Sequence, residues 1–218
     1  LMPVQTGLIS FDNQALNRQI KTQMGVVFQE SSLDPKLTCR ENLLLFAALY
    51  SKAAVPTEVA GLDLNAQVKN LSGGMKRKLE LTRVFLHQPN LVLMDEPTTG
   101  LDLRSFEEFW VGLRTKKQTV ILTTHKAEEA EKCDRLLVLH EGKIMLSESP
   151  AVFKKRVSED QIILRMQDGS VSTTSTLEGH KLLPRLIENL PKDSVVSAEV
   201  RRPSLADAFL KVTGVSLA

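Results

Sequence analysis

The amino-acid sequence predicts an α/β fold over residues 1–150, followed by a smaller α+β region over residues 151–218. Two observations support the first part. Short continuous apolar runs alternate with helical segments, as in a parallel sheet covered by helices. The run Leu91–Met94 also ends in Asp95-Glu96, which places carboxylates at the end of a buried strand. After residue 150 the pattern changes to three further strands and two helices, which indicates an appendage.

The elements of the first region follow from turn and capping signals. Thr38 and Glu41 fit a capping box that opens a helix. Ser72 fits the N-cap of a helix that reaches about Gln88 and is stopped by Pro89. Strands are predicted over 7–11, 24–28, 91–94 and 119–123, the last two buried, with further helices over 103–113 and 126–131. We expect a small helical subdomain over about residues 40–88.

Hairpin and helix signals also order the rest of the chain. Glu141-Gly142 is a favourable turn pair between strands over 135–140 and 143–146. The appendage is predicted to contain strands over 161–166, 171–176 and 194–200, and helices over 178–190 and 204–212.

Composition excludes several classes of protein. The 218 residues are 42% hydrophobic and 25% charged, which is typical of a globular protein, and the net charge of +2 does not suggest a nucleic-acid partner. No apolar run is long enough to cross a bilayer, so membrane work would require a partner. Cys39 and Cys133 are expected to be reduced thiols of a cytosolic protein. The scattered His87, His140 and His180 suggest no metal site.

The acidic pair Asp95-Glu96 is the first candidate for chemistry. Open α/β sheets bind ligands at the carboxyl ends of their strands. There Asp95 could hold Mg²⁺, and Glu96 could polarise a water for attack on a phosphate. A solvent-facing acidic pair at a strand end is an equally good interpretation of the dipeptide alone.

Ser72-Gly73-Gly74 is the second candidate. Backbone N–H groups at a helix N-terminus favour phosphate, and glycines permit close backbone approach. An ordinary loop-to-helix entry with a serine cap is the commoner meaning of these residues in isolation.

Five motifs in one order resemble the ABC ATPase family, a branch of the P-loop NTPases. They are Gln29 of the Q-loop, Leu71-Ser72-Gly73-Gly74 of the signature, Leu91–Glu96 of Walker B, Gly100-Leu101-Asp102 of the D-loop, and the switch histidine His125. The resemblance extends from about residue 3 to the C-terminus.

The resemblance implies ATP and Mg²⁺ as ligands, and two such subunits that enclose two ATP molecules head to tail. Ser72, Gly73 and Gly74 would contact the γ-phosphate of ATP held by the other subunit. The basic residues of the same helix, Lys76, Arg77 and Lys78, would serve that opposite nucleotide.

The resemblance also assigns roles to the remaining motif residues. Gln29 and Asp95 would contact Mg²⁺, and Glu96 and His125 would act on the water and the γ-phosphate. Asp102 would communicate across the dimer.

The segments Val27–Asp34 and Gly74–Leu81, and the C-terminal Arg202–Leu210, are similar to the daunorubicin-resistance type of export ATPase. That branch implies a separate transmembrane permease, a homodimer of the ATP-binding subunit, and a position on the inner face of the cell membrane.

Three departures from the family stand out. The phosphate-binding Walker A loop, expected before Pro3, is absent from the 218 residues, which suggests a fragment or a decayed copy that is inactive alone. The segment 51–70 is short for the family. Leu103 stands where a proline is usual.

Two other functions remain open. One is a non-transport ABC ATPase, although coiled-coil insertions and tandem halves are not seen. The other is a non-catalytic remnant that acts as an interaction module, against which Glu96 and His125 argue.

Overall fold

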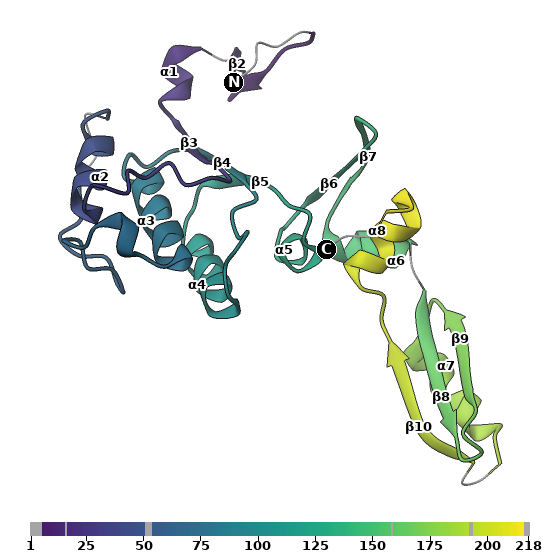
Figure 1. Cartoon of the computed structure of the whole chain (residues 1–218). Coiled ribbons are helices and arrows are strands. Elements are labelled where there is room, and N and C mark those ends of the chain that lie inside the picture. The colour runs from purple at the N-terminus through teal and green to yellow at the C-terminus, as the bar shows by residue number, and fades with distance from the viewer. Residues whose placement is uncertain (1–5, 16, 51–53, 158, 192–193, 216–218) are drawn as a thin grey trace. The chain divides into compact units, whose positions relative to one another are not determined.

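The computed structural model describes residues 6–15, 17–50, 54–157, 159–191 and 194–215. Contacts divide the chain into two compact units, residues 1–124 and 125–218 (Figure 1). The beginning of the family resemblance near residue 3, and residues 51–53 of the short segment, lie outside the described residues. The domain boundary near residue 150 and the helical subdomain over 40–88 stay predictions.

A three-stranded parallel sheet forms the centre of the first unit. Its order is β3 (Met24–Val27), β4 (Leu91–Asp95) and β5 (Thr119–Thr123), so β4 is hydrogen-bonded on both sides. The apolar side chains of β4 are mostly buried, as its continuous apolar sequence predicts. Because the strands are parallel, the segments that follow β3 and β4 leave the sheet at the same edge.

The burial predicted for residues 119–123 is wrong. The side chains of β5 alternate between exposed and half-buried, and Ile121 is 52% exposed. The strand itself is present, but it lies at the edge of the sheet that the structure describes, where one flank has no neighbouring strand. An apolar sequence therefore predicted the strand correctly and its position in the sheet incorrectly.

The helices of the first unit begin where their caps predict. Thr38 and Glu41 form the capping box of α2 (Cys39–Ala47), in which Thr38 N donates to the Glu41 carboxylate over 2.7 Å. This hydrogen bond lowers the pKa of Glu41. Ser72 caps α3 (Gly73–Phe85), which ends slightly earlier than expected.

α3 packs closely on β3 because one strand residue lacks a side chain. A Cβ added to Gly25 would lie 2.6 Å from Cγ1 of Val84 on the helix. Figure 1 shows α3 and α4 (Leu103–Arg114) below the strands of this unit. Phe106, Phe109 and Trp110 of α4 are buried, in agreement with a packing role for the aromatic side chains.

The short segment before the signature contributes to the core, although most of its described residues are exposed. It contains the 3-10 helix η1 (Val68–Asn70) and several buried apolar side chains. The cluster that joins this segment to α2 and α3 consists of Leu33, Cys39, Leu43, Leu62, Leu64, Val68, Leu71 and Leu79. Burial of Cys39 there raises the pKa of its thiol.

Near the N-terminus, β1 (Ser10–Phe11) and β2 (Gln14–Ala15) form a hairpin that is shorter than the strand expected over 7–11. Its turn residues Asp12 and Asn13 have φ values of 48° and 61°, which these residue types tolerate better than most. A one-turn helix, α1 (Arg18–Lys21), follows the hairpin.

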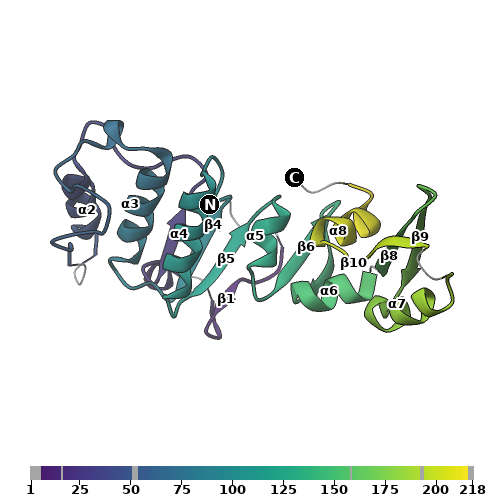
Figure 2. The same ribbon diagram turned by 90° about the horizontal axis from the view of Figure 1, so that it is seen from below.

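The second unit contains two antiparallel sheets. The hairpin predicted around Glu141-Gly142 joins β6 to β7, and β8 lies between β10 and β9 in the other sheet. Figure 2 shows α7 against this sheet. The elements are α5 (Ala127–Glu131), β6 (Leu136–His140), β7 (Lys143–Glu148), α6 (Pro150–Val157), β8 (Asp160–Met166), β9 (Val171–Thr176), α7 (Gly179–Glu188), β10 (Val195–Arg201) and α8 (Leu205–Thr213).

The last helix joins elements that come much earlier in the chain. Leu205 and Ala208 of α8 are almost fully buried in a cluster with Ala130, Val138 and Phe153. α8 thus packs beside α5 and α6. The strands and helices predicted for the appendage are all present. No helix in the described ranges is both long and apolar enough to cross a membrane.

Candidate functional site

The catalytic candidate Glu96 lies at the carboxyl edge of the sheet, directly after β4. Its φ of 41° falls in the left-handed region, which is unfavourable for a residue with a side chain. The backbone N–H donates to the carbonyl and the hydroxyl of Thr123, each over 3.2 Å. The end of β5 therefore stabilises an otherwise strained backbone conformation next to Asp95.

Gln29 and Glu96 are brought together although 67 residues separate them in the sequence. The Nε2 atom of Gln29 donates to Oε2 of Glu96 over 3.1 Å, and Thr99 Oγ1 donates to the same oxygen over 3.2 Å. Two donors thus orient the Glu96 carboxylate. The contact arises because β3 and β4 are parallel neighbours whose following loops meet at one edge.

Asp95 is the last residue of β4, and its side chain is exposed. Thr123 Oγ1 donates a short hydrogen bond to Oδ1 of Asp95. Thr123 therefore contacts both members of the acidic pair, through its hydroxyl to Asp95 and through its carbonyl to the Glu96 backbone. Sequence reasoning missed this residue, although its place at the end of the neighbouring strand was a usable signal.

The donor set suits a magnesium ion that is shared with phosphate. Within the described ranges no group of three or more His, Cys, Asp or Glu side chains could hold a metal. Magnesium, however, is commonly bound by one or two carboxylates together with substrate phosphates and water. Asp95 offers a carboxylate, and Gln29 still has its amide oxygen because its nitrogen contacts Glu96.

The signature residues open α3, where Ser72 Oγ accepts a hydrogen bond from Met75 N over 3.3 Å. A Cβ added to Gly74 would lie 2.2 Å from Oγ and 2.8 Å from Cβ of Ser105. A Cβ on Gly73 would lie 3.8 Å from the carbonyl oxygen of Gly100. Gly74 is thus required by the close approach of α4, besides any need for access to phosphate.

Asp102 is the N-cap of α4 and accepts a hydrogen bond from Ser105 N over 2.8 Å. This backbone hydrogen bond is the main reason that the pKa of Asp102 is lowered. The D-loop residue therefore has a structural role inside its own subunit. The signature and the D-loop also share a groove of about 710 Å³ between α3 and α4, lined by Ser72, Gly74 and Asp102 among others.

One of the three basic residues after the signature, Arg77, does not have the role that the sequence predicts. Its side chain is only 8% exposed, and it donates to the carbonyl of Phe28 over 3.1 Å and to Glu80 over 2.8 Å. It faces the Q-loop of its own subunit, so the expectation that it serves the opposite nucleotide is wrong for this side chain. The spacing of Arg77 and Glu80, three residues apart on a helix, was a signal for an ion pair.

The motif residues fall in different units. Gln29, Asp95 and Glu96 form one cluster in the first unit, and the signature residues meet the D-loop in another part of it. His125 is the first residue of the second unit. The role expected of His125 therefore rests on the family resemblance alone.

The chain is similar to known proteins. The family model "ABC transporter" matches residues 1–99. A Nod factor export ATP-binding protein I of Paraburkholderia xenovorans is 36% identical over 226 aligned positions, covering 90% of this chain and 74% of that protein. A protein of the same name from Rhizobium sp. strain N33 is 43% identical, covering 92% of this chain and 75% of that protein.

These matches place the chain in a family. It belongs to the ATP-binding subunits of ABC transporters. The family has a P-loop NTPase fold, binds ATP and Mg²⁺, and hydrolyses ATP in its complete members.

Proposed function

We propose that this chain belongs to the ATP-hydrolysing subunit of an export system, with Glu96 as the residue that activates water. The contact between Gln29 and Glu96 carries the proposal, because it orients a carboxylate beside Asp95 at the binding edge of the sheet. A carboxylate that hydrogen bonds hold in place beside the bound phosphate can accept a proton from an attacking water.

The neighbouring residues would divide the remaining work. Asp95 and Gln29 would hold Mg²⁺, which neutralises phosphate charge when it is bound. Thr123 would keep the two carboxylates in place through its hydroxyl and carbonyl groups. His125 would contact the γ-phosphate and the water, as the family implies.

A second copy of the subunit would complete each site. Ser72, Gly73 and Gly74 lie at the N-terminus of a 13-residue helix, whose free N–H groups favour phosphate. These residues would bind the ATP held by the partner in a homodimer. Asp102, which caps the adjacent helix α4, would transmit the state of one site to the other.

Export is proposed from the similarity of the chain to Nod factor export ATP-binding proteins. The resemblance to daunorubicin-resistance ATPases leads to the same kind of function. The subunit would work on the inner face of the membrane with a separate permease that carries the substrate.

The experiment compares ATP turnover of the complete transport complex with and without Glu96→Gln. An amide cannot act as a base, so turnover should fall by about a hundredfold or more while ATP binding persists. Glu58→Gln, which alters an exposed carboxylate of the same unit, is the matched control and should keep normal turnover. Turnover of Glu96→Gln equal to that of the unchanged protein would remove Glu96 from this role.

We include the 218 residues alone in the same assay. They contain no Gly-x-x-x-x-Gly-Lys-Ser/Thr sequence, the loop whose N–H groups and lysine hold the β- and γ-phosphates. Little turnover is therefore expected from them by themselves. Turnover comparable to that of the complete protein would contradict this part of the proposal.

A further inference from the structure

Three side chains on one face of α3 hold the backbone of the Q-loop segment 28–32. Arg77 donates to the carbonyls of Phe28 and Gln29 over 3.1 and 3.4 Å. Glu80 Oε1 accepts from Ser32 N over 3.1 Å. Arg83 donates to the carbonyl of Ser32 over 2.9 Å. The spacing of three residues between successive side chains puts all of them on the same side of the helix.

The central pair of this group is buried. The side chains of Arg77 and Glu80 are 8% and 4% exposed, and their charged atoms lie 2.8 Å apart. Buried charges need partners for their remaining donors and lone pairs. Two carbonyls and one N–H group of the Q-loop segment supply them, so the ion pair and the loop depend on each other.

We infer that Arg77 and Glu80 are positioning residues that couple the signature helix to the Gln29–Glu96 contact. The inference rests on the proposed role of Glu96. Arg77 lies one helical turn after Gly73, and it holds the carbonyl of the residue whose side chain contacts Glu96. A movement of α3 on binding phosphate would therefore shift Gln29 relative to Glu96.

A double variant separates this coupling from folding. Arg77→Met with Glu80→Leu replaces the buried pair by apolar side chains of similar size, an exchange that proteins often tolerate. It removes the acceptor of the Ser32 amide but leaves Asp34 N bound to Asn42 over 2.8 Å. Amide hydrogen exchange at Ser32 should become about tenfold faster or more, while exchange at Asp34 stays within about twofold.

Ser32 exchange that rises no more than Asp34 exchange would overturn the inference. This measurement needs no ATPase activity. A failure here is therefore distinct from a failure of the proposed function, which the Glu96→Gln assay detects. Glu108→Gln, which removes the ion pairs of Glu108 with Lys78 of α3 and with Arg104 of α4, is the matched control and should change neither amide.

Turnover of the complete complex supplies the second test. The double variant should lower kcat about tenfold and leave the KM for ATP nearly unchanged, because a misplaced side chain slows the reaction without removing contacts to ATP. In a Gln29→Ala background the double variant should cause little further loss, since the effect acts through Gln29. A full tenfold loss in that background would show a merely structural role and overturn the inference.

Discussion

Two loops of the first unit follow neighbouring parallel strands but are held in opposite ways. Residues 28–32 after β3 depend on side chains of a distant helix, above all Arg77 and Glu80. Residues 96–102 after β4 are held at Glu96 by the neighbouring strand end, through Thr123, and then by hydrogen bonds within the loop. Thr99 N donates to the carbonyl of Glu96, and Leu101 N donates to the carbonyl of Thr98.

This difference indicates which of the two loops would change position when another element of the fold moves. The loop after β4 is bonded to the adjacent strand end and to itself, and it ends in a helix cap, so it can keep the acidic pair in a constant place. The loop after β3 takes its position from α3, so the contact of Gln29 with Glu96 reports where the signature helix lies. The following variants test this contrast, beginning with the largest effect.

Arg77→Ala should destabilise the first unit most. The change leaves Glu80 buried without its cation and removes two hydrogen bonds to the loop, so the free energy of unfolding should fall by about 3 to 5 kcal/mol. Trp110, the only tryptophan and a buried residue of this unit, reports the transition by fluorescence in urea.

Arg104→Ala is the control for this variant. Its side chain is 89% exposed in an ion pair with Glu108, so removal should change stability by less than about 0.5 kcal/mol. Equal losses for the two arginines would mean that the buried pair does not anchor the loop.

Gly74→Ala should have the next largest effect. The added methyl group would overlap Ser105 at the start of α4, which should cost about 1 to 3 kcal/mol of stability. Ser105→Gly removes both overlapping atoms and should therefore rescue the variant in part. Unfolding in urea, followed through Trp110, measures each variant and the pair.

Gly112→Ala gives a matched control on α4. No atom lies within 4 Å of a Cβ at this position, so alanine should be neutral or stabilise the helix by up to about 1 kcal/mol. A loss at Gly112 as large as that at Gly74 would contradict the explanation by close packing.

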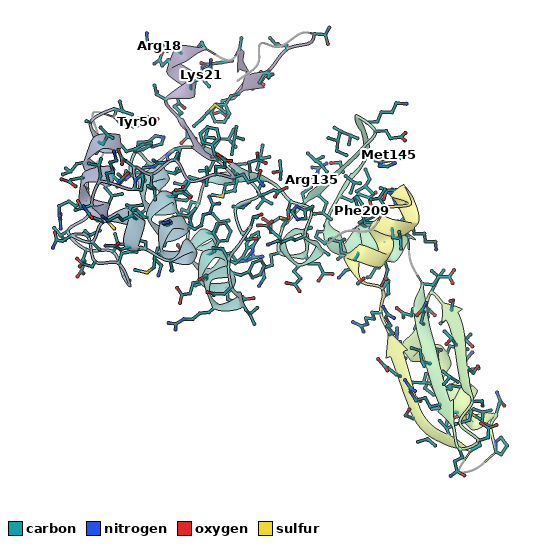
Figure 3. All side chains as sticks on the ribbon, in the orientation of Figure 1. Arg18, Lys21, Tyr50, Arg135, Met145 and Phe209 are labelled. Carbon is teal, nitrogen blue, oxygen red and sulfur yellow. The ribbon has the colours of Figure 1, made fainter. Side chains whose placement is uncertain are left out.

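His87 tests the other end of α3, where its Nε2 atom lies 3.3 Å from the carbonyl of Met24 and its ring stacks on Tyr50 at 4.0 Å. Tyr50, labelled in Figure 3, lies three residues after the end of α2. Burial lowers the pKa of His87, whereas the Met24 contact acts in the opposite direction. The neutral ring is therefore favoured in the folded state.

Because the folded pKa lies below the unfolded value of about 6.5, this stabilisation is present above pH 6.5 and is lost as the pH falls through the folded pKa. Stability measured by urea unfolding should decline from about pH 7 to pH 5, with uptake of less than about one proton per unfolding event from this group. His87→Phe keeps a ring against Tyr50 and should flatten that decline. An identical pH dependence in both proteins would exclude His87 as its source.

Thr99→Val should have the smallest effect. It removes an exposed hydrogen bond to Glu96, but the backbone bonds of the loop after β4 remain. The free energy of unfolding should change by less than about 0.5 kcal/mol. A loss similar to that of Arg77→Ala, measured in the same way, would show that this loop is not locally held and would break the comparison.

Local signals in the sequence were sufficient to predict most helices and strands and to locate the motifs along the chain. Thr38, Ser72 and Asp102 cap helices through groups only three residues away, and such contacts form wherever the helix does. The apolar run of β4 likewise predicts a strand with carboxylates at its end, because burial on two faces requires apolar side chains throughout.

The tertiary structure alone decided the positions that depend on distant partners. The sequence of β5 is as apolar as a central strand requires, yet the strand lies at the sheet edge because strand order depends on pairing and not on composition. In the sequence, Arg77 cannot be distinguished from the basic residues on either side of it. Only the fold shows that Arg77 donates to the carbonyl of Phe28. Capping acts within one turn of chain, whereas a buried ion pair is stable only where other segments complete its hydrogen bonds.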